Sequence, residues 1–240
     1  MANIYTFSRT ENKYILSNEI YEKLMSDIIG RLTPDSYFNS TVYSLYLDTE
    51  DKQLIRGSID GGIYKEKLRI RAYDDTAIKG DVFLEIKKKY DGVVYKRRIS
   101  APIGDLKKYL YHGVKPEDSQ IINEIDYVLN FYGKLTPSML ITYDRLAFVS
   151  RDDKNLRITF DRNLRYKTDN MLLYGKCDGE QILSSNEIIM EIKSANAVPL
   201  WLCSALDRYD LFPVSFSKYG TAFKINNTGL KGEIKNASNF

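Results

Sequence analysis

The sequence has few of the residues on which many enzymes depend for metal binding and nucleophilic catalysis. Its 240 residues include one histidine, His112, and two cysteines, Cys177 and Cys203. A single histidine in a Tyr-His-Gly turn argues against a catalytic triad and against histidine-ligated zinc. The two cysteines lack the spacing of metal ligands, so we interpret them as free thiols of a reducing compartment and expect a cytoplasmic protein.

Long apolar runs and a strong overall charge are also missing. No stretch reaches the roughly 18 apolar residues of a membrane span, and the first residues, Met1–Arg9, lack the charged start and apolar run of a signal peptide. The net charge of +3 gives no global basic field for non-specific nucleic-acid binding. A hydrophobic fraction of 43% supports a proper core. We expect one domain over residues 1–225 and a polar, disordered tail over 226–240.

Positive charge is concentrated in one stretch, Lys65–Arg98, which alternates with period two and therefore predicts three strands. One face of these strands is apolar and the other is almost entirely basic. The residues of the basic face are Lys67, Arg69 and Arg71 in the first strand, Glu85, Lys87 and Lys89 in the second, and Lys96 and Arg98 in the third. The choice of Lys96 and Arg98 over Arg97 depends on the alternation alone, and a β-bulge would change it.

A basic strand face has an ordinary explanation, because one face of an antiparallel sheet is commonly solvated. Like charges directly opposite each other destabilise a sheet, however, so a solvated face normally mixes signs. A face that stays positive over neighbouring strands predicts an anionic partner with closely spaced charges. Phosphate chains fit this description, and arginine suits them because its planar fork binds phosphate oxygens in pairs.

The rest of the chain predicts more strands, separated and followed by helices. We expect strands over 4–16, 41–49, 139–150, 155–162 and 187–194, with another near Met171, and helices over 17–32, 103–111, after Pro116, over 199–209 and up to Ile225. Thr33-Pro34-Asp35 is expected to end the first helix. The predicted class is α+β, with about eight antiparallel strands closed into a barrel. Its apolar residues would face covering helices and its charges would line the bore.

Eight short motifs occur along the chain in an order that resembles a known family. They are Glu11-Asn-Lys13-Tyr14, Lys67-Leu-Arg69-Ile-Arg71, Glu85-Ile-Lys87-Lys-Lys89, Lys96-Arg-Arg98, Tyr143-Asp-Arg145-Leu-Ala-Phe148, Leu156-Arg157-Ile-Thr-Phe-Asp161, Glu191-Ile-Lys193 and Ser217-Lys218-Tyr219. From about residue 7 to 224 they resemble the successive motifs of the VTC domain. This is the polyphosphate polymerase branch of the triphosphate tunnel metalloenzymes, a CYTH-like superfamily.

The resemblance implies a tunnel that binds triphosphate and polyphosphate. It also implies an enzyme that transfers the γ-phosphate of ATP to a growing polyphosphate chain with Mn²⁺ or Mg²⁺. Carried over motif by motif, the catalytic cations are Arg69, Arg71, Lys87, Arg145, Arg157 and Lys218. The substrate-binding cations are Lys13, Lys96, Arg98 and Lys193, to which the basic strand faces add Lys67 and Lys89. The metal-binding carboxylate is Glu191, with Glu85 and Glu11 as further candidates.

Three alternatives remain open at this point. The same tunnel could hydrolyse tripolyphosphate or a nucleoside triphosphate, which relatives of this fold do with more carboxylates around the metal. It could also bind polyphosphate or inositol polyphosphates without turnover. RNA binding is disfavoured, because Tyr73, Tyr90 and Tyr95 do not interleave with the cations as stacking aromatics would. We therefore expect ATP, pyrophosphate and polyphosphate as partners and no nucleic acid, and the sequence points to no particular protein partner.

Overall fold

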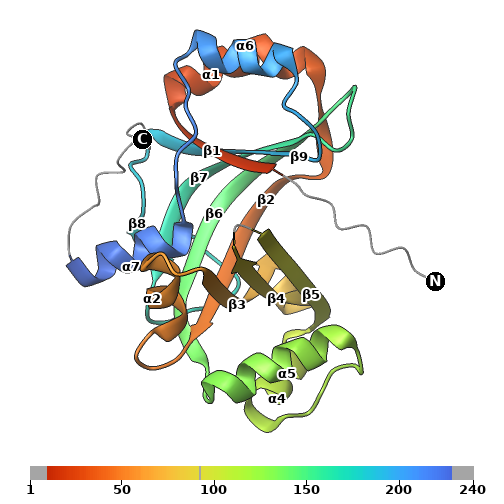
Figure 1. The fold of residues 1–240 in the computed structure, drawn as a ribbon, viewed down its shortest axis with the longest axis vertical. Helices are drawn as coiled ribbons and strands as arrows, with labels where there is room; N and C mark the ends of the chain where they lie inside the picture. Colours follow the sequence, from red (N-terminus) through yellow and green to blue (C-terminus); the bar gives the residue numbers. More distant parts are fainter. Residues whose placement is uncertain (1–9, 92, 229–240) are drawn as a thin grey trace.

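One curved antiparallel sheet organises the molecule. The computed structural model describes residues 10–91 and 93–228, and within them the sheet has nine strands in the order β1-β9-β7-β6-β2-β3-β4-β5, with β8 paired to β7 (Figure 1). The strands are β1 Thr10–Ser17, β2 Leu32–Asp48, β3 Tyr64–Tyr73, β4 Asp81–Tyr90, β5 Val93–Pro102, β6 Thr136–Ser150, β7 Arg157–Lys167, β8 Glu180–Gln181 and β9 Glu187–Ser194. The α+β class and the antiparallel pairing are confirmed.

Seven α-helices and one short 3-10 helix accompany the sheet in the described part of the chain. They are α1 Asn18–Ile28, the 3-10 helix Ile29–Arg31, α2 Gln53–Ile59, α3 Thr76–Lys79, α4 Ile103–His112, α5 Gln120–Tyr132, α6 Leu200–Arg208 and α7 Lys218–Thr228. Ser17 caps α1 as predicted, since its side chain accepts a hydrogen bond from the Ile20 N–H at 3.2 Å. None of these helices is long and apolar enough to cross a membrane.

Three hydrophobic clusters hold the helices to the sheet. Helices α4 and α5 pack on the outer face of β2–β5, and α1 and α6 pack on the outer face of β1, β9 and β7. Apolar residues of the alternating strands, such as Leu68, Ile70, Leu84 and Ile86, face the first pair of helices, as predicted. Helices α2 and α7 instead join a third cluster with Tyr46, Ile141 and other side chains of the concave face. That face is therefore apolar under α7 and polar beyond it.

The predicted closed barrel is not confirmed, because the sheet is not closed by hydrogen bonds. β1 and β5 are the two ends of the strand order and do not pair with each other in the described residues. A short segment, residues 214–217, instead runs from the edge of β1 toward β3. Val214 donates its N–H to the Lys13 carbonyl at 2.7 Å, the Lys13 Nζ donates to the Phe216 carbonyl at 2.9 Å, and the Lys67 Nζ donates to the Ser217 Oγ at 3.1 Å.

Several predicted boundaries were wrong. β2 begins at Leu32, well before the expected Thr41, and Pro34 lies beside a register shift where its missing N–H is tolerated. No strand forms near Met171 in the described residues, because β7 continues to Lys167 and the following pairing is the short β8. α7 continues to Thr228, so residues 226–228 of the expected tail are helical. The remaining tail, 229–240, and the start of the first predicted strand, 4–9, lie outside the described residues.

Candidate functional site

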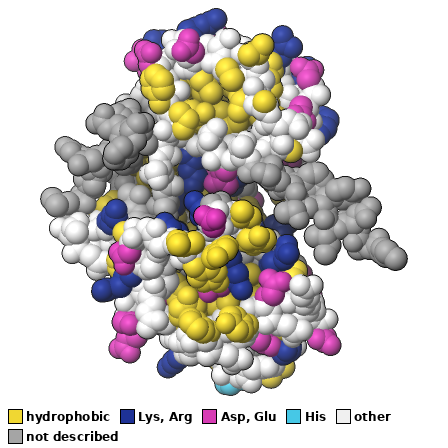
Figure 2. Space-filling model, in the orientation of Figure 1, with side chains coloured by type: hydrophobic (Ala, Val, Ile, Leu, Met, Phe, Trp, Pro, Cys, Tyr) yellow, Lys and Arg dark blue, Asp and Glu magenta, His cyan; other side chains and the backbone are white. Residues whose placement is uncertain are grey.

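The strand register gathers basic side chains on the concave face of the sheet. Lys67 pairs with Lys87, which pairs with Lys96, so three lysines form one row across β3, β4 and β5. In the next row Arg69 pairs with Glu85, which pairs with Arg98. Figure 2 shows a hollow in the middle of the molecule with basic and acidic side chains inside it. The period-two prediction therefore brings these residues together as expected.

We call the residues of this face on β3, β4 and β5 the basic wall. Its members are Lys67, Arg69, Arg71, Glu85, Lys87, Lys96 and Arg98. Glu85 is 1% exposed and contacts three of the cations: Arg69 Nη2 at 2.6 Å, Lys96 Nζ at 2.9 Å and Arg71 Nε at 3.7 Å. Burial opposes ionisation of Glu85, but Arg69, Arg71 and Lys96 outweigh it and hold its pKa well below the usual range. This carboxylate orients arginines within a strongly positive wall.

The lysines of the basic wall are crowded. Burial, together with the charges of Lys87, Lys13 and Arg69, lowers the pKa of Lys67 to about 8. Burial likewise lowers the pKa of Lys87 and of Lys96, and nearby cations add to the effect. Lys87 has no ion pair among the described residues. Burial is the largest cause of these shifts. The wall sets six cations against the one carboxylate of Glu85, and this imbalance favours binding of an anion.

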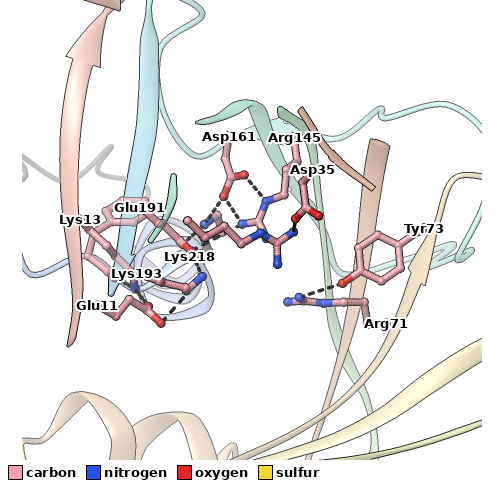
Figure 3. Close-up of polar contacts among 12 residues, drawn as sticks. Glu11, Lys13, Asp35, Arg71, Tyr73, Arg145, Asp161, Glu191, Lys193 and Lys218 are labelled. Carbon is pink, nitrogen blue, oxygen red and sulfur yellow. Dashed lines mark hydrogen bonds and ion pairs between the residues drawn. The ribbon is translucent and has the colours of Figure 1, made fainter. Parts of the chain in front are cut away.

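Arg71 retains hydrogen-bonding capacity. Its Nε is buried and has no hydrogen-bond partner in the described structure, and its Nη1 lies 3.5 Å from the Tyr73 hydroxyl. In Figure 3 its guanidinium extends across the open space toward the group around Lys218 and Glu191. A buried donor without a partner disfavours the empty site, so an anion that bonds it would be stabilised.

Three cations of β4 and β5 lie at the edge of the basic wall or outside it. Arg98 places its guanidinium 4.5 Å from the centre of the Phe83 ring. Lys89 is exposed near the end of β4. Arg97 points to the outer face, where its Nε lies 3.8 Å from Glu124 of α5. The structure thus places Lys96 inward and Arg97 outward, in agreement with the alternation.

We call the facing group the paired wall, because almost every cation in it touches a carboxylate. Its members are Glu11 and Lys13 on β1, Arg145 on β6, Asp161 on β7, Glu191 and Lys193 on β9, and Lys218 at the start of α7 (Figure 3). Arg145 donates two hydrogen bonds to Asp161, from Nε at 2.6 Å and from Nη2 at 2.7 Å. The Lys218 Nζ lies 2.7 Å from Asp161 and 2.8 Å from Glu191. The Lys193 Nζ lies 2.8 Å from Glu191.

The pKa shifts of the paired wall follow from these contacts. Asp161 is fully buried and burial would raise its pKa, but Arg145 and Lys218 lower it below the ordinary value. Glu191 behaves in the same way, with Lys218, Lys193 and Arg145 as the dominant cations. Asp161 and Glu191 together raise the pKa of Lys218 against the effect of its burial. All of these groups are therefore charged at neutral pH and fixed by one another.

Arg157 lies apart from both networks. Its Nη2 pairs with Asp35 of β2 at 2.8 Å, and its buried Nε has no hydrogen-bond partner among the described residues. Arg157 is paired in register with Lys193, so it extends the paired wall along β7. Its charge is partly neutralised by an acid that the sequence did not identify.

Sequence reasoning missed three residues of the site: Asp35, Tyr46 and Asp161. Asp161 follows Arg157 at an even spacing on the same strand face, so the alternation already carried a signal for it. Tyr46 accepts a hydrogen bond from Arg69 Nη1 at 3.0 Å, and although burial opposes ionisation, Arg69, Lys67 and Arg71 lower its pKa to about 8. Neither Asp35 nor Tyr46 stands out in the sequence, because each depends on a partner from a distant strand.

The carboxylates that suit a divalent metal lie on the paired wall. Glu191 and Glu11 are on neighbouring strands and share the Lys193 Nζ, at 2.8 and 3.9 Å. Among the described residues no three acidic, histidine or cysteine side chains form a metal-binding group. Mg²⁺ typically takes one or two carboxylates together with substrate phosphates and water, so Glu191 and Glu11 fit such an ion when phosphate is present. Glu85, surrounded by the cations of the other wall, does not join this pair.

Comparisons with known proteins identify a family and similar folds. The family model of the VTC domain matches residues 8–226. A candidate adenylate cyclase from Bacillus halodurans has a similar structure, with a TM-score of 0.55 and 14% sequence identity over 91% of this chain and 95% of that one. A candidate adenylyl cyclase from Hippeastrum with a dominant triphosphatase activity gives a TM-score of 0.51 and 14% identity over 89% of this chain and 94% of that one. No curated protein matches the sequence significantly.

Proposed function

The chain belongs to the VTC domain family, and from this premise we propose that it is a polyphosphate polymerase. Membership supports an enzyme that binds triphosphate or polyphosphate and uses a divalent metal. The proposed reaction transfers the γ-phosphate of ATP to the end of an inorganic polyphosphate chain. We place this reaction in the cytoplasm, since Cys177 and Cys203 are free thiols.

One observation carries the proposal: the lysine row Lys67–Lys87–Lys96 lies beside Arg69 and Arg71 and faces the paired wall. Six cations of the basic wall are opposed there by the single carboxylate of Glu85. A row of cations along neighbouring strands matches the repeated charges of a phosphate chain rather than a single small anion. Burial is the main cause of the lowered pKa of all three lysines and neighbouring cations add to it, so a bound anion would favour their charged forms.

Phosphoryl transfer needs little covalent chemistry from the protein. Its transition state is loose, so catalysis consists mainly of aligning donor and acceptor and stabilising charge on the equatorial oxygens. Arg69, held by Glu85 and Tyr46, and Arg71, whose Nε lies 3.7 Å from Glu85 without a hydrogen bond, would stabilise these oxygens. The acceptor is a phosphate oxygen that is already ionised near neutral pH. No general base is therefore required.

Glu191 and Glu11 would hold the Mn²⁺ or Mg²⁺ ion, which would supply positive charge to offset the negative charge of the phosphate groups. The remaining residues of the paired wall then have a positioning role. Arg145 and Lys218 fix the Glu191 carboxylate through contacts of 3.6 and 2.8 Å. Fixed orientation matters, because a ligand that reorients during the reaction stabilises the transition state less.

A second candidate function is hydrolysis of tripolyphosphate. The similar fold of the Hippeastrum protein, whose dominant activity is triphosphatase, favours it. In this chain each buried acid of the paired wall is neutralised by two or more cations. That arrangement leaves neither Asp161 nor Glu191 as an unpaired base to activate water, which favours transfer to a phosphate acceptor over hydrolysis.

The test is an assay of the purified chain with ATP and Mn²⁺, with and without pyrophosphate as primer. We expect a ladder of long polyphosphate chains on a stained gel, and no ladder from a Lys87→Ala variant. Release of free phosphate from tripolyphosphate without any ladder would replace the polymerase with the hydrolase. Neither product, accompanied by a melting temperature that rises with polyphosphate, would leave a binding module.

A further inference from the structure

Three consecutive residues, Ser217, Lys218 and Tyr219, lie between the basic wall and the paired wall. Ser217 accepts a hydrogen bond from Lys67 of the basic wall, and Lys218 lies between the two buried acids of the paired wall. Tyr219 touches neither group of charges. Its ring is 1% exposed and joins the apolar cluster that packs α7 onto the concave face. The proposed reaction gives Lys218 a role but gives none to Tyr219.

The hydroxyl of Tyr219 is anchored to a buried carboxylate, Asp48, at the end of β2. The two oxygens lie 3.1 Å apart, and the Ser138 Oγ lies 3.0 Å from the same hydroxyl. Asp48 is completely buried and also accepts hydrogen bonds from the backbone N–H groups of Thr49, Leu54 and Ile55, at 2.9, 2.9 and 3.1 Å. Asp48 is therefore fixed by β2 and α2, independently of α7.

The ring of Tyr219 continues this connection to the basic wall. It stacks on Tyr46 with centroids 4.1 Å apart and planes inclined by 17°. The Tyr46 hydroxyl accepts the hydrogen bond from Arg69 Nη1 at 3.0 Å. One side of Tyr219 thus supports Arg69 through Tyr46, and its peptide neighbour, Lys218, reaches Asp161 and Glu191. A single side chain connects both walls of the site to one rigid anchor.

We propose that Tyr219 is a positioning residue, which Asp48 holds in place so that Lys218 and Arg69 keep a fixed separation across the phosphate path. This inference rests on the proposed function, because the separation matters only if a phosphate chain is gripped between the walls. Catalysis by charge stabilisation is sensitive to such distances, and a displacement of about 1 Å can lower turnover roughly 100-fold. Tyr219 acts through Lys218 and Tyr46, without contact to the substrate.

The test compares Tyr219→Phe with a matched control, Tyr109→Phe. Tyr109 of α4 is equally buried, at 2% exposed, and its hydroxyl also donates to a carboxylate, Asp126, at 2.5 Å. It lies under the outer face of the sheet, away from both walls. Both variants lose one buried hydroxyl bonded to an acid, so both should lose a similar amount of thermal stability.

We expect Tyr219→Phe to lower kcat by about tenfold while its Kd for tripolyphosphate, measured by calorimetry, changes less than about threefold. Tyr109→Phe should leave both values within about twofold of wild type. Ser138→Ala removes only the neutral partner of the Tyr219 hydroxyl, so its kcat should lie between those of the two variants. It replaces Tyr219→Phe in the test if that variant folds poorly. Equal losses in Tyr219→Phe and Tyr109→Phe, in step with the folded fraction, would overturn the positioning role.

The comparison also separates this inference from the proposed function. Turnover is measured as polyphosphate synthesis or, if the wild type makes no chains, as hydrolysis of tripolyphosphate. A hydrolytic wild type with a selective kcat defect in Tyr219→Phe overturns the polymerase and supports the positioning role. If the wild type shows neither turnover, no reaction depends on this separation, and the positioning role is overturned together with both activities.

Discussion

The same triplet, Glu-Ile-Lys, occurs on both walls of the site with opposite results. On β4, Glu85 is surrounded by Arg69, Arg71 and Lys96, and Lys87 has no ion pair in the described structure. On β9, Lys193 pairs with Glu191 two residues earlier, and Glu191 also contacts Lys218. The triplet therefore leaves a free cation on one wall and a fixed carboxylate on the other. Neighbours on adjacent strands and helices, and not the triplet itself, decide the role of each side chain.

The largest expected effect is on turnover, and it concerns Lys87, the lysine of the triplet on the basic wall. Lys87→Ala should lower polymerase turnover by roughly 100-fold or more, because it removes a preorganised cation without leaving a carboxylate unpaired. Its melting temperature should stay level or rise, since burial, with Lys13 and Arg69, disfavours the charged Lys87 more than Glu11 favours it. Gel and phosphate-release assays measure the first result and calorimetry the second. Lys88→Ala, on the outer face beside Glu66, is the control that should stay active.

The next largest effect is on stability and is expected from a variant that disrupts the paired wall. Lys218→Met removes the ammonium between Asp161 and Glu191 and leaves two buried acids with fewer cations. We expect it to lower the free energy of unfolding by about 3 kcal/mol, as for other buried ion pairs that lose one partner. Lys193→Met, whose side chain is 32% exposed, should lose less than about 1 kcal/mol. Urea denaturation measures the free energy of unfolding of both variants, and equal losses would show that the paired wall is not a buried network.

A third pair of variants tests which carboxylate of the site binds the metal. Glu191→Gln should abolish the stimulation of turnover by Mn²⁺ and weaken metal binding by roughly 10- to 100-fold. Glu85→Gln should lower turnover through the disturbed arginines yet keep the dependence on Mn²⁺. Initial rates over a metal titration give both answers. Loss of metal stimulation in Glu85→Gln alone would move the ion to the basic wall.

The smallest expected effect is a pH dependence of substrate affinity. The pKa of Lys67 and the pKa of Tyr46 are both about 8, and the charged form of each favours the charged form of the other. Raising the pH through this range therefore lowers the positive charge of the basic wall, through loss of the Lys67 proton or of the Tyr46 proton. The affinity for tripolyphosphate should therefore fall roughly three- to tenfold between pH 7 and pH 9. Tyr46→Phe should flatten part of this slope in calorimetry. A slope identical to wild type would exclude Tyr46 as a contributor.

Much of the fold and half of the site follow from the sequence by a local rule. Strict alternation fixes which residues of β3, β4 and β9 share a face, because the side-chain period of a strand is two. It correctly separated Arg97 from Lys96 and predicted the apolar faces under α4 and α5. The order of motifs then identified the family from residues that lie far apart in the chain.

The rest depends on distant partners that no local pattern encodes. Whether β1 pairs with β5 is decided by the curvature of the whole sheet, so the closed barrel could not be verified from alternation. Alternation places Asp161 on the same strand face as Arg157, but its pairing with Arg145 and with Lys218, which lies much later in the chain, has no local signal. Pro34 resembled a helix end, yet the register shift in β2 accommodates it within a strand.

The pairing of β1 with β9 has a consequence for how the molecule is made. β1 has no other strand partner in the described structure, and Thr10 bonds Ser194, 184 residues later. At roughly 5–20 residues per second, a ribosome needs about 10–40 s to synthesise that interval. During this time the β2–β5 meander can already form from neighbours in the chain, while Glu11 and Lys13 have no strand to join. We therefore expect the two walls to mature at different times, and the paired wall, where we propose that the metal binds, to be completed last.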